Sequence, residues 1–228
     1  MNEMFSLRER EIFQALHELS NCTFVIIGGY AVNAYTLPRF SVDCDIVIKD
    51  KAELATVEKI LLGMGYVKEE LPPKFRYSDD FCRYEKRLDT NFLVSFDILI
   101  NAVTDRLTGV HFTADWVFEN SGKRRLLGKT TTTELDIRIV NITALIVMKI
   151  IACRATDIRD VFMMLPSAQD KDWIKSEVSS RVEFKEKMNK IIQKISSKQF
   201  KDGLSGVYGY IDQKVFDKPV KAVRSLLD

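Results

Sequence analysis

The chain has few histidines and cysteines, and its cysteines lack the spacing of metal ligands. Only two histidines, His17 and His111, occur among 228 residues, and the four cysteines include no C-x-x-C pair. Structural zinc sites take their ligands from closely spaced cysteines and histidines. The sequence therefore argues against a zinc site and predicts free, mostly buried thiols.

The sequence also lacks long apolar runs and a strong excess of either charge. No segment approaches the roughly 20 consecutive apolar residues of a membrane-spanning helix, and the first residues, MNEMFSLRERE, lack the apolar core of a signal peptide. We therefore expect a cytoplasmic protein that has no membrane segment. A net charge of +2 does not by itself indicate nucleic-acid binding. Any RNA-binding surface must be local, and Lys123-Arg124-Arg125 with Lys129 is the densest candidate.

What the sequence does contain is a glycine pair between a short apolar run and a helix-like segment. Phe24 to Ile27 is apolar, Gly28-Gly29 follows, and Tyr30 to Tyr35 has the small-residue content of a helix start. A strand, a glycine turn and a helix in this order expose backbone N–H groups at the helix N-terminus. Such groups favour a phosphate.

A pair of aspartates follows this segment. In Asp43-Cys44-Asp45 the two acids are two positions apart on a predicted strand, so they share one face while Cys44 lies on the other. Neighbouring carboxylates repel each other, and a cation offsets that repulsion. Oxygen ligands that leave room for water and phosphate suit Mg²⁺. A Gly-Gly pair alone is usually a turn and an Asp-x-Asp alone a solvated strand end, but together they indicate a metal–nucleotide site.

These residues resemble a known family. Gly28-Gly29, thirteen residues, then Asp43-x-Asp45, with Arg39 and Ser41 just ahead of the pair, resembles the first motif of the DNA polymerase beta-type nucleotidyltransferase superfamily. The form GGYAVNAY…PRFSVDCD is most similar to the branch that holds the AbiEii-type toxins. The superfamily more often has Gly-Ser at the turn, whereas the AbiEii-like branch resembles this sequence in using Gly-Gly.

A third carboxylate lies in the apolar run FLVSFDILI, residues 92 to 100. Alternation along this predicted strand places Asp97 on one face with Ser95, among apolar neighbours. A buried carboxylate needs a partner, because desolvation of its charge is costly. That partner is either a metal ion, as the position of the third acid in the resembling family implies, or a nearby arginine in a salt bridge.

The remaining patterns predict an α/β (α+β) chain: a nucleotidyltransferase fold with a small mixed sheet flanked by helices, followed by a helical C-terminal part. We predict helices at 6–20, capped by Ser6 with Glu9, at 51–64 and at 113–119, strands at 81–88, 92–100 and 135–140, and a hairpin at 122–133. Leu71-Pro72-Pro73 excludes regular structure locally. A change to helical pattern at Asn141 divides a domain of residues 1–140 from a helical region, 141–228, predicted to complete and cap the active site. Gly203, Gly206 and Gly209 predict a loop.

One lysine interrupts the apolar helix predicted at 142–153. Lys149 either extends outward to solvent or reaches a bound triphosphate. The series Lys149, Arg154, Asp157 and Asp160 resembles an element of AbiEii-like proteins. A continuous helix would separate Lys149 from Asp160 by about 16 Å, so we expect Thr156 to cap a new helix that turns Asp157 towards the site, with Asp160 in packing or an ion pair.

The resemblance implies a nucleotidyltransferase that uses Mg²⁺ or Mn²⁺ to move a nucleoside monophosphate from a nucleoside triphosphate to a hydroxyl. RNA, and a tRNA end in particular, is the acceptor that the toxin-like relatives imply, with an antitoxin protein as partner. A small-molecule or protein acceptor, or a module that binds nucleotide or a partner without turnover, are the other interpretations. The predicted site comprises the metal ligands Asp43, Asp45 and Asp97, the last also as base, and the nucleotide-binding residues Gly28, Gly29, Arg39, Ser41, Lys149 and Asp157.

Overall fold

The computed structural model of the chain describes residues 2–70, 80–90, 92–209 and 212–227. The chain divides into two compact units. The first contains residues 1–34, 38–103 and 111–140, and the second contains residues 35–37, 104–110 and 141–228. The break predicted at Leu71-Pro72-Pro73 lies outside the described residues.

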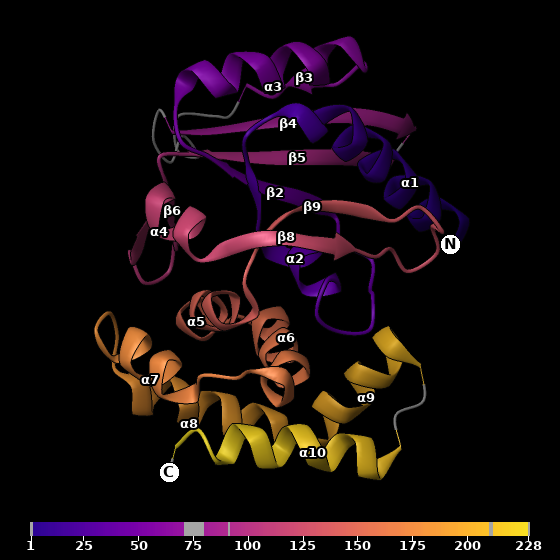
Figure 1. The fold of residues 1–228 in the computed structure, drawn as a ribbon. Helices are drawn as coiled ribbons and strands as arrows, with labels where there is room; N and C mark the ends of the chain where they lie inside the picture. The colour runs from indigo at the N-terminus through magenta and orange to yellow at the C-terminus, as the bar shows by residue number, and fades with distance from the viewer. Residues whose placement is uncertain (1, 71–79, 91, 210–211, 228) are drawn as a thin grey trace. The chain divides into compact units, whose positions relative to one another are not determined.

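The first unit is built on a mixed sheet of seven strands in the order β3-β4-β5-β2-β1-β9-β8 (Figure 1). β2 is parallel to β5 and β1 is parallel to β9, while the other neighbouring pairs are antiparallel. The predicted α/β class with a mixed sheet and flanking helices is confirmed. The strands are β1 (Val25–Ile26), β2 (Asp43–Ile48), β3 (Val67–Lys68), β4 (Phe81–Asp89), β5 (Phe92–Ile100), β8 (Ser121–Leu126) and β9 (Leu135–Val140), and a two-stranded sheet joins β6 (Ala102–Thr104) to β7 (His111–Thr113).

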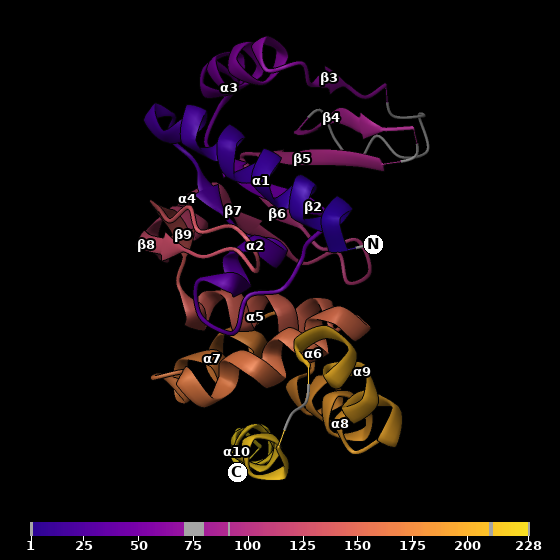
Figure 2. The ribbon, with the colours of Figure 1, turned by 90° about the vertical axis from the view of Figure 1, so that its right-hand side faces the viewer.

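Four helices accompany this sheet: α1 (Asn2–Glu18), α2 (Gly28–Asn33), α3 (Lys51–Gly63) and α4 (Ala114–Glu119). Cys44, Phe96 and Tyr84 occupy one row on one face of the sheet, and all three are buried. On this face Tyr84 donates a 2.6 Å hydrogen bond to Glu58 of α3, and α1 crosses the strands in Figure 2. Because side chains alternate along a strand, the neighbouring aspartates of β2 lie on the opposite face.

Helix α1 begins earlier than the sequence predicted, and the predicted cap of Ser6 with Glu9 is wrong. Both residues lie inside the helix. The Glu9 carboxylate is buried and accepts hydrogen bonds from the backbone N–H groups of Lys129, Thr130 and Thr131, at 2.6 to 3.0 Å, and from the Thr130 hydroxyl. Glu9 therefore holds the loop after β8 against α1.

The hairpin predicted at 122–133 is also wrong. Residues 121 to 126 form one strand, β8, which pairs with β9 in an antiparallel register from Ser121–Val140 to Leu126–Leu135. The turn of the real hairpin is the segment that Glu9 holds. The helices predicted at 51–64 and 113–119 and the strands at 81–88, 92–100 and 135–140 are confirmed to within a residue or two.

The second unit is helical from Asn141 onward. The Asn141 side chain accepts a 2.8 Å hydrogen bond from the Ala144 N–H and caps the first of these helices. The loop predicted around Gly203 and Gly206 is wrong, because both lie within a helix that ends at Tyr208 and is followed by Gly209. The helices are α5 (Ile142–Ala152), α6 (Ala155–Met164), α7 (Lys171–Ser179), α8 (Phe184–Ile195), α9 (Lys198–Tyr208) and α10 (Gln213–Arg224).

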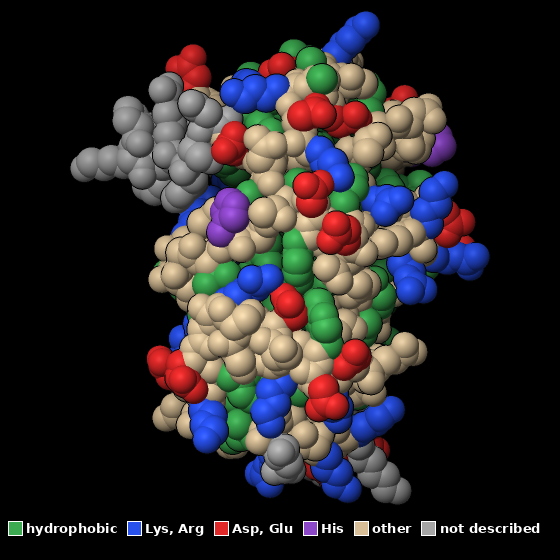
Figure 3. All heavy atoms as spheres, turned by 60° about the vertical axis from the view of Figure 1, so that its left-hand side comes forward, with side chains coloured by type: hydrophobic (Ala, Val, Ile, Leu, Met, Phe, Trp, Pro, Cys, Tyr) green, Lys and Arg blue, Asp and Glu red, His purple; other side chains and the backbone are tan. Residues whose placement is uncertain are grey.

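Among the described residues, no helix has the length and apolarity needed to cross a membrane. Acidic and basic side chains lie interspersed over the face drawn in Figure 3. This distribution agrees with the small net charge of the sequence.

Candidate functional site

The glycine pair lies at the junction of β1 and α2, where the backbone must approach other groups closely. Gly28 has a φ of +64°, a conformation that favours glycine. A Cβ atom at this position would overlap the Asp45 carboxylate, and a Cβ atom at Gly29 would overlap the Ser41 hydroxyl and lie 3.4 Å from the Arg39 guanidinium. The two glycines therefore let one carboxylate, one hydroxyl and one guanidinium reach the start of α2.

The loop that carries Arg39 and Ser41 is held by the last residue of α2. The buried Asn33 side chain donates a 2.9 Å hydrogen bond to the Arg39 carbonyl and accepts a 3.1 Å bond from the Arg39 N–H. Arg39 itself is buried. Asn33 received no role from the sequence, because its contact joins residues six apart through a loop whose course only the fold defines.

The three predicted carboxylates share one face of two adjacent strands. In the parallel register of β2 and β5, Asp45 lies beside Asp97 and Asp43 lies beside Ser95. Side chains of adjacent residues in a sheet point to the same face. The sheet therefore places Asp43, Asp45 and Asp97 on one face, whereas Cys44 is buried on the other face.

Asp97 is also ion-paired with an arginine, which is the second of the two partners considered for it. Arg83 of β4 faces Asp97 across the antiparallel β4–β5 pair, and its Nε and Nη2 donate 2.7 Å hydrogen bonds to the two carboxylate oxygens. These hydrogen bonds raise the pKa of Arg83 above its usual value, against the opposing effect of burial. The charge at position 83 was visible in the sequence, but its partner depends on the strand register.

The row of charges continues one residue further, to Glu69. Glu69 follows β3, and its N–H donates a 2.8 Å hydrogen bond to the Arg83 carbonyl. The Glu69 carboxylate lies 3.9 Å from Arg83 Nε. One row therefore reads Asp45, Asp97 and Arg83 across the strands and ends at Glu69, just beyond β3.

The negative charges of the three aspartates affect the Cys44 thiol on the opposite face of β2. Burial raises the pKa of the Cys44 thiol well above its usual value, and the charges of Asp45, Asp43 and Asp97 raise it further. A thiol in this environment stays protonated and unreactive at neutral pH. Cys44 is therefore a packing residue, as the sequence predicted.

The residues present fit a hard divalent cation in kind, because all three carry carboxylate oxygens. In the part of the chain that the structure describes, no group of three His, Cys, Asp or Glu side chains is arranged to hold a metal ion. Both oxygens of Asp97 are engaged by Arg83. A cation at Asp97 therefore competes with a guanidinium that already pairs with both oxygens.

In the second unit, Lys149 does not extend to solvent. It is buried, and its Nζ lies 2.9 Å from carboxylate oxygens of both Asp157 and Asp160. Lys149 and Asp160 are not separated as a continuous helix would separate them, because α5 ends at Ala152, Cys153 has a φ of +52°, and α6 turns back. Burial opposes the lysine charge, but Asp160 and Asp157 raise its pKa overall.

The predicted start of α6 is also wrong. Arg154, rather than Thr156, occupies the N-cap position, and its N–H donates to the Asp157 carboxylate at 3.2 Å. Asp160 forms the ion pair that we expected for it. The Asp157 carboxylate thus accepts a hydrogen bond from the N-cap backbone of α6 and also pairs with the Lys149 ammonium.

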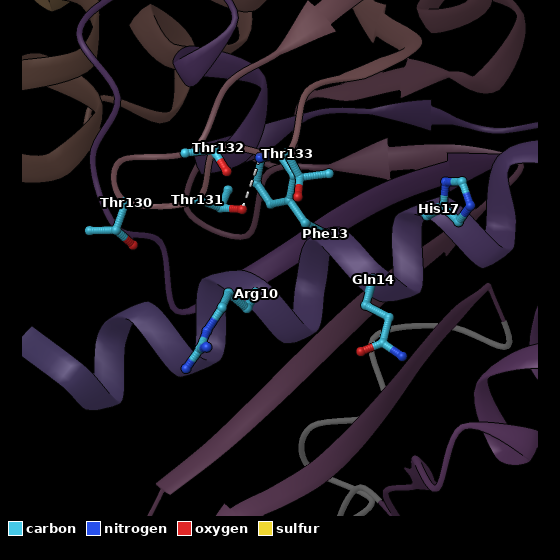
Figure 4. Close-up of a pocket in the computed structure, with 8 residues that line it drawn as sticks. All are labelled: Arg10, Phe13, Gln14, His17, Thr130, Thr131, Thr132 and Thr133. Atoms are coloured by element: carbon cyan, nitrogen blue, oxygen red, sulfur yellow. Dashed lines mark hydrogen bonds between the residues drawn. The ribbon is translucent and has the colours of Figure 1, made fainter.

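A separate cavity of about 550 Å³ lies between α1 and the loop after β8. Figure 4 shows its lining, in which the Arg10 and Gln14 side chains extend away from the threonines of the loop. The predicted site residues do not line it. The lining residues are Arg10, Phe13, Gln14, His17, Thr130, Thr131, Thr132 and Thr133.

No protein-family model matches the chain, and no curated protein matches its sequence. Solved structures of nucleotidyltransferases resemble it. A proposed nucleotidyltransferase from H. pylori has a TM-score of 0.57 and 16% sequence identity, with 99% of this chain and 96% of that chain covered. MenT4, a nucleotidyltransferase toxin from Mycobacterium tuberculosis H37Rv, has a TM-score of 0.61 and 13% identity, with 99% of this chain and 84% of that chain covered. This chain has the nucleotidyltransferase fold.

Proposed function

We propose that the chain is a metal-dependent nucleotidyltransferase that moves a nucleoside monophosphate from a nucleoside triphosphate to a hydroxyl acceptor. One observation carries this proposal. Asp45 and Asp97 lie side by side in parallel strands, with Asp43 on the same face, and Gly28 leaves room for the Asp45 carboxylate. Fold alone does not define an activity, but these residues supply the acids that the reaction requires.

In the proposed reaction, the acceptor hydroxyl oxygen forms a bond to the α-phosphorus of the triphosphate. The bond between the α-phosphorus and the bridging oxygen breaks, and pyrophosphate leaves with that electron pair. The proton of the hydroxyl passes to a carboxylate, for which we propose Asp97. Such a step depends on positioning and on stabilisation of the phosphate charges.

Asp43, Asp45 and Asp97 would hold the divalent cation, Mg²⁺ or Mn²⁺. When bound, such an ion neutralises phosphate charge and lowers the pKa of a coordinated hydroxyl. The backbone at Gly28 and Gly29 would approach the phosphates. Arg39 and Ser41, which lie against Gly29, would contact a phosphate or the ribose.

The predicted contact of Lys149 with the triphosphate, and the predicted role of Asp157 at the site, stay predictions. The observed partners of Lys149 are Asp157 and Asp160. These pairs account for the buried charge without a nucleotide. We likewise keep the closing of the site by residues 141–228 as a proposal.

We propose RNA, and a tRNA end in particular, as the acceptor, in a toxin-like protein that an antitoxin protein neutralises. The motif GGYAVNAY…PRFSVDCD, similar to the AbiEii-like branch, supports this proposal. The likeness of the fold to a nucleotidyltransferase toxin agrees with it. A small-molecule or protein hydroxyl is the second candidate acceptor.

The test is incubation of the purified chain with each labelled nucleoside triphosphate, Mg²⁺ and total RNA, followed by separation of RNA, protein and small molecules. We expect label on RNA with one triphosphate, and loss of at least about 100-fold in rate for Asp45→Asn, because the removed carboxylate stabilises the reacting phosphates. Asp136→Asn is the matched control, since Asp136 is exposed on β9 of the same sheet.

Label on protein or on a small molecule would retain the transferase and replace the RNA acceptor. Absence of label in every fraction, with nucleotide binding that survives Asp43→Ala, would favour the non-catalytic module instead. Equal rates for wild type and Asp45→Asn would contradict the proposed site.

A further inference from the structure

The row Asp45, Asp97, Arg83 and Glu69 places one cation between two sets of acids. Arg83 reaches Asp97 through two 2.7 Å hydrogen bonds and lies 3.9 Å from the Glu69 carboxylate on its other side. Its side chain is 29% exposed, whereas that of Asp97 is 8% exposed. The acid is thus fixed and buried, while the guanidinium has access to solvent and a second partner.

A fork of this kind engages both oxygens of a carboxylate and places a positive charge beside it. The two N–H groups of a guanidinium match the two oxygens of a carboxylate, and the paired charges strengthen both hydrogen bonds. A buried carboxylate without a partner is costly. In the absence of metal, Arg83 therefore supplies the positive charge that Asp97 requires.

We propose that Arg83 is a stand-in cation that keeps Asp97 from a divalent ion, and that metal binding transfers the guanidinium from Asp97 to Glu69. This inference rests on the proposed function, since it takes Asp45 and Asp97 as ligands of the ion. The transfer breaks no covalent bond. It exchanges one charged partner of Asp97 for another.

Glu69 is suited to receive the guanidinium. Its backbone hydrogen bond to the Arg83 carbonyl fixes the two residues in one row, and its side chain is 37% exposed. A short movement of the Arg83 side chain therefore replaces one ion pair with another without moving the strand. The pairing with Glu69 offsets part of the cost of releasing Asp97.

The test is binding of Mn²⁺ alone to the full chain, measured by the electron paramagnetic resonance signal of free Mn²⁺, with no nucleotide present. We expect Arg83→Gln to bind Mn²⁺ about tenfold more tightly than wild type, since a charge-assisted hydrogen bond no longer competes. Arg83→Lys, which keeps the charge but lacks the fork, should lie between them. Asp97→Asn added to Arg83→Gln should abolish the gain.

The matched control is Arg87→Gln. Arg87 is on the same strand, is exposed, and donates to the Thr90 carbonyl, so its removal changes the net charge equally and leaves Asp97 paired. Because Arg83→Gln leaves a buried carboxylate unpaired, its melting temperature is measured as well. Mn²⁺ should raise the melting temperature of Arg83→Gln more than that of wild type. If Arg83→Gln does not fold, the Mn²⁺ affinity of Arg83→Lys is compared with that of wild type instead.

Equal Mn²⁺ affinity of wild type, Arg83→Lys and Arg83→Gln would overturn the inference, and so would an equal gain in Arg87→Gln or no binding by any variant. Asp45-dependent Mn²⁺ binding that ignores Arg83 would refute the stand-in cation and leave the transferase standing. Tighter binding by Arg83→Gln without nucleotide transfer to any acceptor would support the stand-in cation and refute the transferase.

Discussion

Gly28 occupies a position where a single methyl group would disturb the acids. The residue combines a φ of +64° with direct contact to the Asp45 carboxylate. We expect Gly28→Ala to lower the free energy of unfolding by about 1–3 kcal/mol, because a side chain at positive φ is strained and Asp45 must move. Urea denaturation measures this loss.

Gly63→Ala is the control for that substitution. Gly63 ends α3, and a Cβ atom there would meet no other atom within 4 Å. We expect its free energy of unfolding to change by less than about 1 kcal/mol. If Gly28→Ala were as stable as Gly63→Ala, the close approach of Gly28 to Asp45 would be refuted.

For single residues, the sequence predicted the direction of a side chain where that direction follows from alternation along a strand. The two-residue spacing of Asp43 and Asp45 and the placement of Asp97 inside an apolar strand predicted three acids on sheet faces. The pairing of Asp97 with Arg83 could not be predicted from alternation alone. It depends on the register between β4 and β5, which contains an irregularity between Arg87 and Asp89, and register is a property of the fold.

A buried charge joins helix α1 to the loop after β8. Glu9 of α1 receives three backbone N–H groups of the loop after β8. We expect Glu9→Gln to lower the free energy of unfolding by about 1.5–3 kcal/mol, because an amide replaces a charged acceptor and turns donors towards donors. Thermal or urea unfolding measures the loss.

Glu3→Gln on the same helix provides the comparison. Glu3 is exposed, so we expect its variant to differ from wild type by less than about 0.5 kcal/mol. Hydrogen exchange should show faster exchange of the Lys129, Thr130 and Thr131 amides in Glu9→Gln alone. Unchanged exchange at those amides would contradict the anchoring role.

The buried pairs of Lys149 connect α5 to α6. Because Asp160 and Asp157 raise the pKa of Lys149 in the folded chain, its contribution to stability is complete below the unfolded pKa, about 10.4, and is lost as pH rises through the folded pKa. We expect Lys149→Met to lower the free energy of unfolding by about 3–5 kcal/mol at pH 8, since two buried acids lose their partner.

Urea denaturation between pH 8 and 11.5 measures that prediction. The difference between wild type and Lys149→Met should shrink only in the most alkaline part of the range. Lys185→Met, which removes an exposed lysine of α8, should stay within about 0.5 kcal/mol of wild type. A pH-independent difference would show that the lysine charge does not stabilise the helix pair.

Elements with strong periodicity were predictable, and those defined by distant contacts were not. The strand at 92–100 and the strand at 135–140 agree with β5 and β9 in their bounds. The false cap at Ser6 and the false hairpin at 122–133 have one shared cause. Glu9 binds a loop more than a hundred residues away, and that loop joins β8 to β9, so local patterns could not assign either partner.

For the whole molecule, the sequence predicted the class: a mixed sheet with helices, followed by helices from Asn141. It did not predict the strand order, because the order depends on how residues far apart in the chain pair. The parallel pair of β1 with β9 joins Ile26 to Ile139. The glycine turn of the site follows β1 directly.

That pairing has a consequence for how the protein is made. β1 is flanked by β2 and β9, so one edge of β1 remains open on the ribosome until residues up to Val140 have left the exit tunnel. Contacts between such distant segments form slowly, and an open strand edge invites wrong pairing. The backbone that leads into the glycine turn therefore acquires its final neighbour late in synthesis, and the sheet of a newly made chain is complete only after β9 has docked.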